Sequence, residues 1–64
     1  MILRDTAFGV INGSINSTIH DQLESYQFIV DNGLTEELTP KQFLFLRGLV
    51  ESGQVHTPVL WMPL

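Results

Sequence analysis

The residues with the greatest chemical potential are two histidines and a few scattered acids. His20 is followed by Asp21, and an acid beside a histidine can orient the imidazole for base catalysis. Neighbouring residues on a helix point about 100° apart, so these two side chains do not face each other. No serine stands in a nucleophile motif, and the chain has no cysteine. We therefore predict a solvated helix start at this position, no catalytic residue, and no enzyme activity.

Metal and cofactor chemistry also lacks the side chains it needs. His20 and His56 are the only histidines, and two histidines without cysteine cannot close a structural zinc site. The pair Glu36-Glu37 falls short of the six to eight oxygens that Ca²⁺ takes from a shaped loop. The sequence predicts neither a metal site nor a cofactor-binding residue.

The charge balance argues against a nucleic acid as partner. The net charge is −4, and Arg4, Lys41 and Arg47 are the only basic residues. Nucleic-acid binding depends on several contacts between Lys or Arg and phosphates, which three scattered cations do not supply. No apolar run approaches the ~20 residues of a membrane span, and we identify no targeting segment. The expectation is a cytoplasmic chain that binds neither nucleic acid nor membrane.

The supply of apolar side chains is large for so short a chain. Hydrophobic residues make up 44 % of the 64 residues, and charged residues only 16 %, against a usual charged share of about 25 %. A domain of this size buries only about 60 % of its unfolded surface. We therefore expect an exposed apolar patch, and such patches tend to mark interaction sites.

The local signals predict a mainly α fold in a single domain that spans residues 1–64. The segment Thr39–Gln42 combines a capping threonine, a proline in the first turn and a glutamine that completes a capping box. Thr18 and Asp21 resemble a second capping box, while Gly33 and Gly53 suit helix ends. The predicted bundle holds two to three helices, at about 2–12, 19–31 and 40–52, followed by an extended C-terminal tail.

Two apolar stripes with helical spacing are expected to form the core between an antiparallel helix pair. Their members are Ile19, Leu23, Tyr26 and Val30 on the first helix of the pair, and Phe43, Leu46, Leu49 and Val50 on the second. Phe28 and Ile29 widen the first stripe, and Leu44 and Phe45 flank the second. Gly48 would let another backbone come close.

Residues 1–13 allow two interpretations. Ile2, Leu3, Ala7, Val10 and Ile11 are spaced as on one helical face, with Asn12-Gly13 as the stop. The same Asn-Gly pair between apolar residues is also a strong signal for a β-hairpin. The alternative fold class is therefore α+β, with an N-terminal hairpin.

The end of the chain is rich in large apolar side chains. Pro58 and Pro63 exclude a helix and a central strand, so the tail should be extended. Val59, Leu60, Trp61 and Met62 either cover the protein's own core or bind a partner, and Trp61 is the only tryptophan.

Together these features predict a small non-enzymatic protein-binding module, such as an inhibitor or adaptor. Proteins of this size and kind are common in phages and mobile elements, which is an argument from length alone. The alternative is a structural homo-oligomer subunit with an apolar self-interface. In either case the partner is another protein or a second copy. The expected partner-binding residues are Phe28, Phe45, Leu60, Trp61 and Met62.

Overall fold

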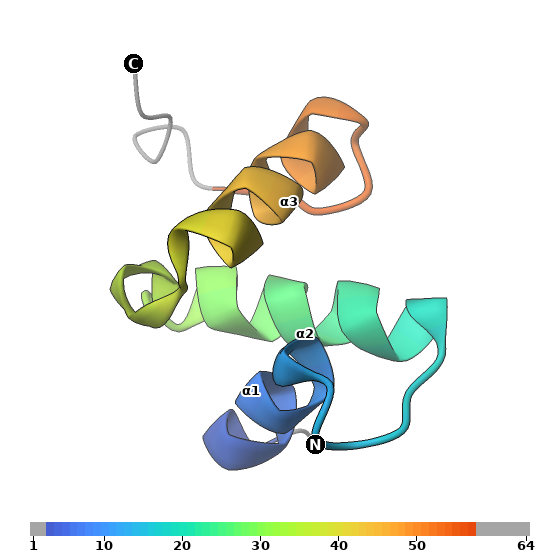
Figure 1. Cartoon of the computed structure of the whole chain (residues 1–64). Helices are drawn as coiled ribbons and strands as arrows, with labels where there is room; N and C mark the ends of the chain where they lie inside the picture. Colours follow the sequence, from blue (N-terminus) through green and yellow to red (C-terminus); the bar gives the residue numbers. More distant parts are fainter. Residues whose placement is uncertain (1–2, 58–64) are drawn as a thin grey trace.

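Three α-helices in sequence build the part of the chain that the computed structural model describes, residues 3–57 (Figure 1). Helix α1 spans Arg4–Asn12, α2 spans Ile19–Asp31 and α3 spans Pro40–Glu51. A short 3₁₀ turn, η1, covers Thr35–Glu37 between α2 and α3. The mainly α class is confirmed. The predicted extended tail at 58–64 lies outside the described residues.

The predicted capping boxes fix where α2 and α3 begin. At α2, the Asp21 backbone N–H donates to Thr18 Oγ1 at 3.1 Å, and the Thr18 N–H donates to Asp21 Oδ2 at 3.0 Å. At α3, the Gln42 N–H donates to Thr39 Oγ1 at 3.1 Å, and the Thr39 N–H donates to Gln42 Oε1 at 2.9 Å. Each box satisfies backbone N–H groups that have no partner inside the helix. The sequence therefore located both starts correctly.

The N-terminal segment is a helix, and the hairpin alternative is wrong. Val10 and Ile11 are helical, and Gly13 ends α1 in the left-handed conformation with φ 82°. The Asn-Gly pair thus supplies a helix stop, and residues 3–57 contain no strand. The helix begins at Arg4 rather than near residue 2, because Leu3 is extended and caps it without a side-chain hydrogen bond.

After α1 the chain folds back over Gly9. The backbone N–H groups of Ser14 and Ile15 both donate to the Gly9 carbonyl, at 3.0 and 3.1 Å. A Cβ on Gly9 would lie 2.5 Å from Ile15 Cδ1. The absence of a side chain at Gly9 therefore lets the α1–α2 connection pass close to the helix.

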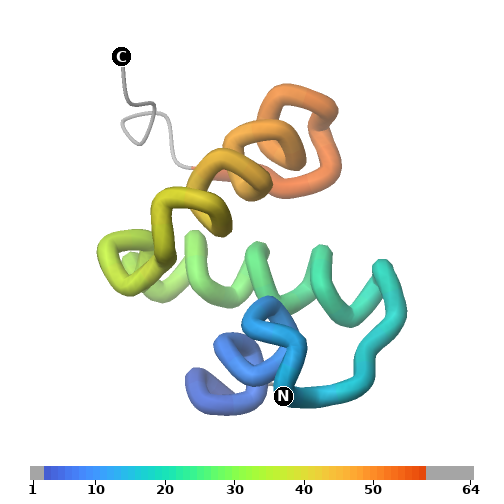
Figure 2. Tube along the Cα trace, viewed as in Figure 1, coloured from blue at the N-terminus to red at the C-terminus, as the bar shows by residue number. Residues whose placement is uncertain are grey.

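Helix α2 lies between the other two, with α1 on one side and α3 on the other (Figures 1 and 2). The most extensive backbone contact is between α1 and α2. On the other side, α3 runs back across α2 in the opposite direction and at a slant, so the expected antiparallel pair is a crossed one (Figure 2). The buried cluster that joins them consists of Tyr26, Val30, Leu46, Leu49 and Val55.

Two expectations about packing are wrong. Ile19 was expected in the inward stripe but is 76 % exposed, because it is the first residue of α2 and the buried cluster begins further along the helix. Within residues 3–57 no other segment approaches Gly48, since a Cβ at this position would have no atom within 4 Å outside the adjacent turns of its own helix. Ile29, which was expected to widen the inward stripe, is fully buried.

Replacing Ser25 with alanine should stabilise the protein. Ser25 is fully buried in α2, and its Oγ has no hydrogen-bond partner among the described residues. Removing an unsatisfied hydroxyl, together with the better helix propensity of alanine, should raise the free energy of unfolding by about 1–2 kcal/mol. Thermal melts of the two proteins measure this. Ser52→Ala is the matched control, because Ser52 Oγ donates to the Leu49 carbonyl at 3.0 Å and its loss should destabilise slightly. A lower melting temperature for Ser25→Ala would contradict the prediction.

Acid should weaken the start of α2. The Asp21 carboxylate accepts the Thr18 backbone N–H, and this hydrogen bond lowers the pKa of Asp21 below its ordinary value of 3.8. A carboxyl group whose pKa is depressed by folding stabilises the fold above its unfolded pKa, and this contribution disappears as the pH falls through the folded pKa. The helix content followed by circular dichroism should therefore fall more steeply below pH 3.8 in the wild type than in Asp21→Asn. Parallel acid curves for the two proteins would exclude this role.

Candidate interaction surface

The most exposed large apolar side chains of α3 are adjacent in sequence. Leu44 is 66 % exposed and Phe45 is 51 % exposed. A small domain gains stability by burying such side chains, so leaving two together in solvent requires an explanation. The helical spacing that turns Leu46 and Leu49 into the core turns Leu44 and Phe45 away from it.

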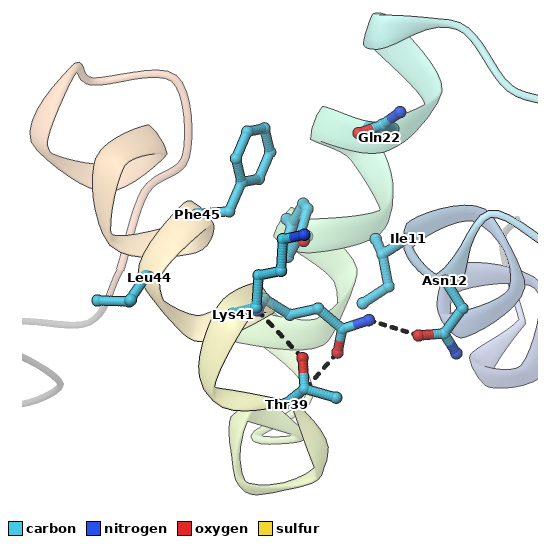
Figure 3. Close-up of a pocket in the computed structure, with 9 residues that line it drawn as sticks. Ile11, Asn12, Gln22, Thr39, Lys41, Leu44 and Phe45 are labelled. Carbon is cyan, nitrogen blue, oxygen red and sulfur yellow. Dashed lines mark hydrogen bonds between the residues drawn. The ribbon is translucent and has the colours of Figure 1, made fainter.

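Phe45 lies at the edge of a groove where all three helices meet (Figure 3). The groove has a volume of about 640 Å³, within the range of pockets that hold small ligands. Helix α1 contributes its last residues, α2 its N-terminal half, and α3 its first two turns together with the cap residue before them. The lining residues are Ile11, Asn12, Gln22, Tyr26, Thr39, Lys41, Gln42, Leu44 and Phe45. In Figure 3, Leu44 lies at the outer edge of the groove with its side chain directed away from Lys41, which extends the apolar surface beyond the groove.

Gln42 holds one rim of the groove in place. Its Oε1 accepts the Thr39 backbone N–H in the capping box, while its Nε2 donates to Asn12 Oδ1 at the end of α1. One side chain therefore ties the start of α3 to the end of α1, which are 30 residues apart in the sequence. This bridge gives the groove a defined shape before any partner binds.

The buried ring of Tyr26 packs against the ring of Phe45. Their ring centroids are 5.6 Å apart and the planes are tilted by 45°, a geometry typical of favourable aromatic pairs. Tyr26 is only 3 % exposed, and burial raises its pKa above the ordinary value of 10.0. Because Phe45 rests on a rigid buried ring, half of its own surface is held toward solvent at small entropic cost.

Lys41 supplies a free positive charge at the groove. Arg4 pairs with Asp5 and Glu37, and Arg47 pairs with Glu51. Lys41 has no ion pair within residues 3–57. In Figure 3 its side chain extends from α3 across the groove. The groove thus combines an apolar wall with one cation.

Phe28 and Phe45, both expected to bind a partner, do not lie together. Phe28 lines a second hollow, and among residues 3–57 that hollow shares no lining residue with the groove at Phe45. Leu60, Trp61 and Met62, the other expected partner-binding residues, lie outside the described residues. Sequence reasoning missed Ile11, Lys41 and Gln42 as groove residues. One signal in the sequence could have identified Gln42: its Oε1 atom completes the capping box, which leaves the Nε2 donor available for another partner.

Other kinds of site find little support in the described part of the chain. Residues 3–57 contain no group of three or more His, Cys, Asp or Glu side chains arranged to hold a metal ion. None of the three helices has the length and apolar character needed to span a bilayer. His20 Nε2 lies 3.8 Å from Glu24 Oε2, and both side chains are exposed on the surface of α2.

Comparison with known proteins identifies no relative: no family model matches the chain, and no curated protein or solved structure is significantly similar to it.

Proposed function

We propose that this protein is a small protein-binding module, of the inhibitor or adaptor kind, that engages its partner through the groove at Phe45. The observation that carries this proposal is the pair Leu44 and Phe45, held in solvent beside a preformed groove. Rigid aromatic side chains next to a pocket are typical of residues that dominate binding energy. Preorganisation by Gln42 and Tyr26 reduces the entropy lost on binding.

The side chains that line the groove indicate which side chains the partner would place against it. Its apolar wall suits a leucine-like or aromatic side chain beside Phe45, and Lys41 suits a carboxylate on the same segment. A chain of net charge −4 repels an acidic partner surface in most orientations. A partner acid that faces Lys41 would be attracted instead, so this contact also fixes the orientation of the partner. We expect Lys41→Glu to slow association, with an effect that decreases at high salt.

Affinity capture with two matched variants tests the proposal. Leu44 and Leu3 are equally exposed, at 66 %, but only Leu44 lines the groove. Leu44→Gln should weaken binding of the captured protein by about 1–2 kcal/mol, or roughly tenfold in Kd, whereas Leu3→Gln should bind as the wild type does. If both variants capture the same protein with wild-type affinity, the groove is not the binding site.

The homo-oligomer remains the second candidate, because the apolar surface at Leu44 and Phe45 would also suit a second copy. Light scattering distinguishes the two. The binding-module proposal predicts a monomer at high micromolar concentration. A wild-type dimer that Leu44→Gln converts to a monomer would favour the homo-oligomer.

A further inference from the structure

Tyr26, the only tyrosine of the chain, carries a hydroxyl group that the rest of the described fold does not use. The residue is 3 % exposed, and its hydroxyl has no hydrogen-bond partner within residues 3–57. Buried tyrosine hydroxyls usually find a partner. Among these residues Ser25 Oγ is the only unpartnered side-chain polar atom that is sealed from solvent. The small exposed part of Tyr26 therefore includes its hydroxyl oxygen, where a ligand atom can reach it.

This hydroxyl belongs to the groove at Phe45. Tyr26 lines the groove, and the centroid of its ring is 5.6 Å from that of Phe45. Lys41 and Phe45 are four residues apart on α3, so their side chains project from the same face of that helix. Figure 3 shows the Lys41 side chain extending across the groove. The groove thus offers a neutral donor at its nearly buried side and a cation at its rim.

The charges and donors of the groove favour an anion. The chain has seven Asp and Glu residues, all within residues 3–57, and none of them lines the groove. Burial raises the pKa of Tyr26 above its ordinary value of 10.0, so the hydroxyl keeps its proton at neutral pH and can donate it to a hydrogen bond. A carboxylate is the strongest acceptor that a protein partner supplies, since hydrogen bonds to an ionised acceptor are about twice as strong as those between neutral groups.

We propose that the partner segment anchors itself in the groove with a glutamate, whose carboxylate accepts a hydrogen bond from the Tyr26 hydroxyl and pairs with Lys41. This inference rests on the proposed binding function of the groove. The aliphatic stem of the glutamate packs against the apolar wall at Ile11 and Phe45, and its two oxygens serve the two donors. The longer stem of glutamate, compared with aspartate, suits a hydroxyl at the nearly buried side of the groove.

Titration of two capped dipeptides, followed by NMR, tests the proposal on the full chain. The probes are Ac-Leu-Glu-NH2 and its neutral counterpart Ac-Leu-Gln-NH2. The wild type should bind the glutamate peptide roughly tenfold more tightly, because only this peptide makes hydrogen bonds with a charged acceptor. Tyr26 gives a single Cζ resonance, since it is the only tyrosine. This resonance should move on addition of the glutamate peptide and move far less with the glutamine peptide.

Two substitutions on α2 separate the hydroxyl of Tyr26 from the fold. Tyr26→Phe keeps the ring and removes only the unpartnered hydroxyl, so the helix content by circular dichroism should stay as in the wild type. Binding of the glutamate peptide should weaken about fivefold. Ser25→Ala is the matched control, because it removes the neighbouring unpartnered hydroxyl, which does not line the groove. It should leave the binding of both peptides unchanged.

Three outcomes would overturn the proposal: equal binding of the two peptides by the wild type, no binding of the glutamate peptide, or a preference that Tyr26→Phe leaves intact. The last would assign the anion to Lys41 alone. Should Tyr26→Phe fail to fold, the Cζ resonance of wild-type Tyr26 decides, and a resonance that ignores the glutamate peptide contradicts the proposal.

Capture of the partner separates this inference from the proposed function. If Leu44→Gln weakens capture and Tyr26→Phe does not, the groove binds the partner but the glutamate anchor is wrong. If neither substitution weakens capture, the groove itself is not the binding site and both proposals fail.

Discussion

Leu46→Ala is expected to unfold much of the protein at room temperature. Leu46 is fully buried and belongs to the cluster that joins α2, α3 and Val55. Truncating a buried leucine costs about 2–5 kcal/mol through lost burial and the cavity left behind. A single core in a chain this short rarely supplies more than about 3–5 kcal/mol, so the loss is comparable to the whole stability. Urea unfolding followed by circular dichroism measures the change.

Leu44→Ala is the matched control for that substitution. It removes the same side chain two positions away on the same helix, where the leucine is exposed rather than buried. Its effect on the free energy of unfolding should stay within about 0.5 kcal/mol. Equal losses from the two substitutions would show that the core does not lie where the structure places it.

Removal of residues 58–64 is expected to cause a loss of similar size. If the tail covers the core, as one of the two sequence-based interpretations expects, burying Trp61 would remove about 200 Å² from water, worth several kcal/mol at about 25 cal/mol per Å². A chain ending at Thr57 should therefore melt at a much lower temperature than the full chain. If the tail instead serves a partner, the truncated chain would melt as the wild type does and lose only partner binding, which would contradict this prediction.

Local chemistry explains why the helices were predictable. The capping pairs at Thr18 and Thr39 define helix starts within four residues of sequence, and Gly33 and Gly53 define the ends in the same way. The predicted limits 19–31 agree with α2, and 40–52 overshoots α3 by one residue. At Asn12-Gly13 two local signals competed. The helical one holds because Ala7 and Val10 gain burial only when α1 forms against the rest of the chain.

The groove could not be predicted because it depends on how the helices cross. Periodicity gives the angular position of Phe45 on α3, but not the neighbour that lies under it, and Tyr26 was assigned only to the core. The bridge from Gln42 to Asn12 joins positions 30 residues apart, and no local pattern reports such a pair. Ile19 shows the same limit, since its spacing matches the buried stripe although it is left in solvent at the first residue of α2.

Site-specific photo-crosslinking in the cells that express this chain tests the partner-binding groove most directly. A benzoylphenylalanine residue in place of Leu44 should form a covalent adduct with one partner protein, and Lys41→Glu in the same chain should reduce its yield. The same photoreactive residue in place of Leu3, which is equally exposed but outside the groove, should form no such adduct. Equal adducts from both positions, or an adduct at Leu44 only with a second copy of the chain, would contradict the proposed binding module.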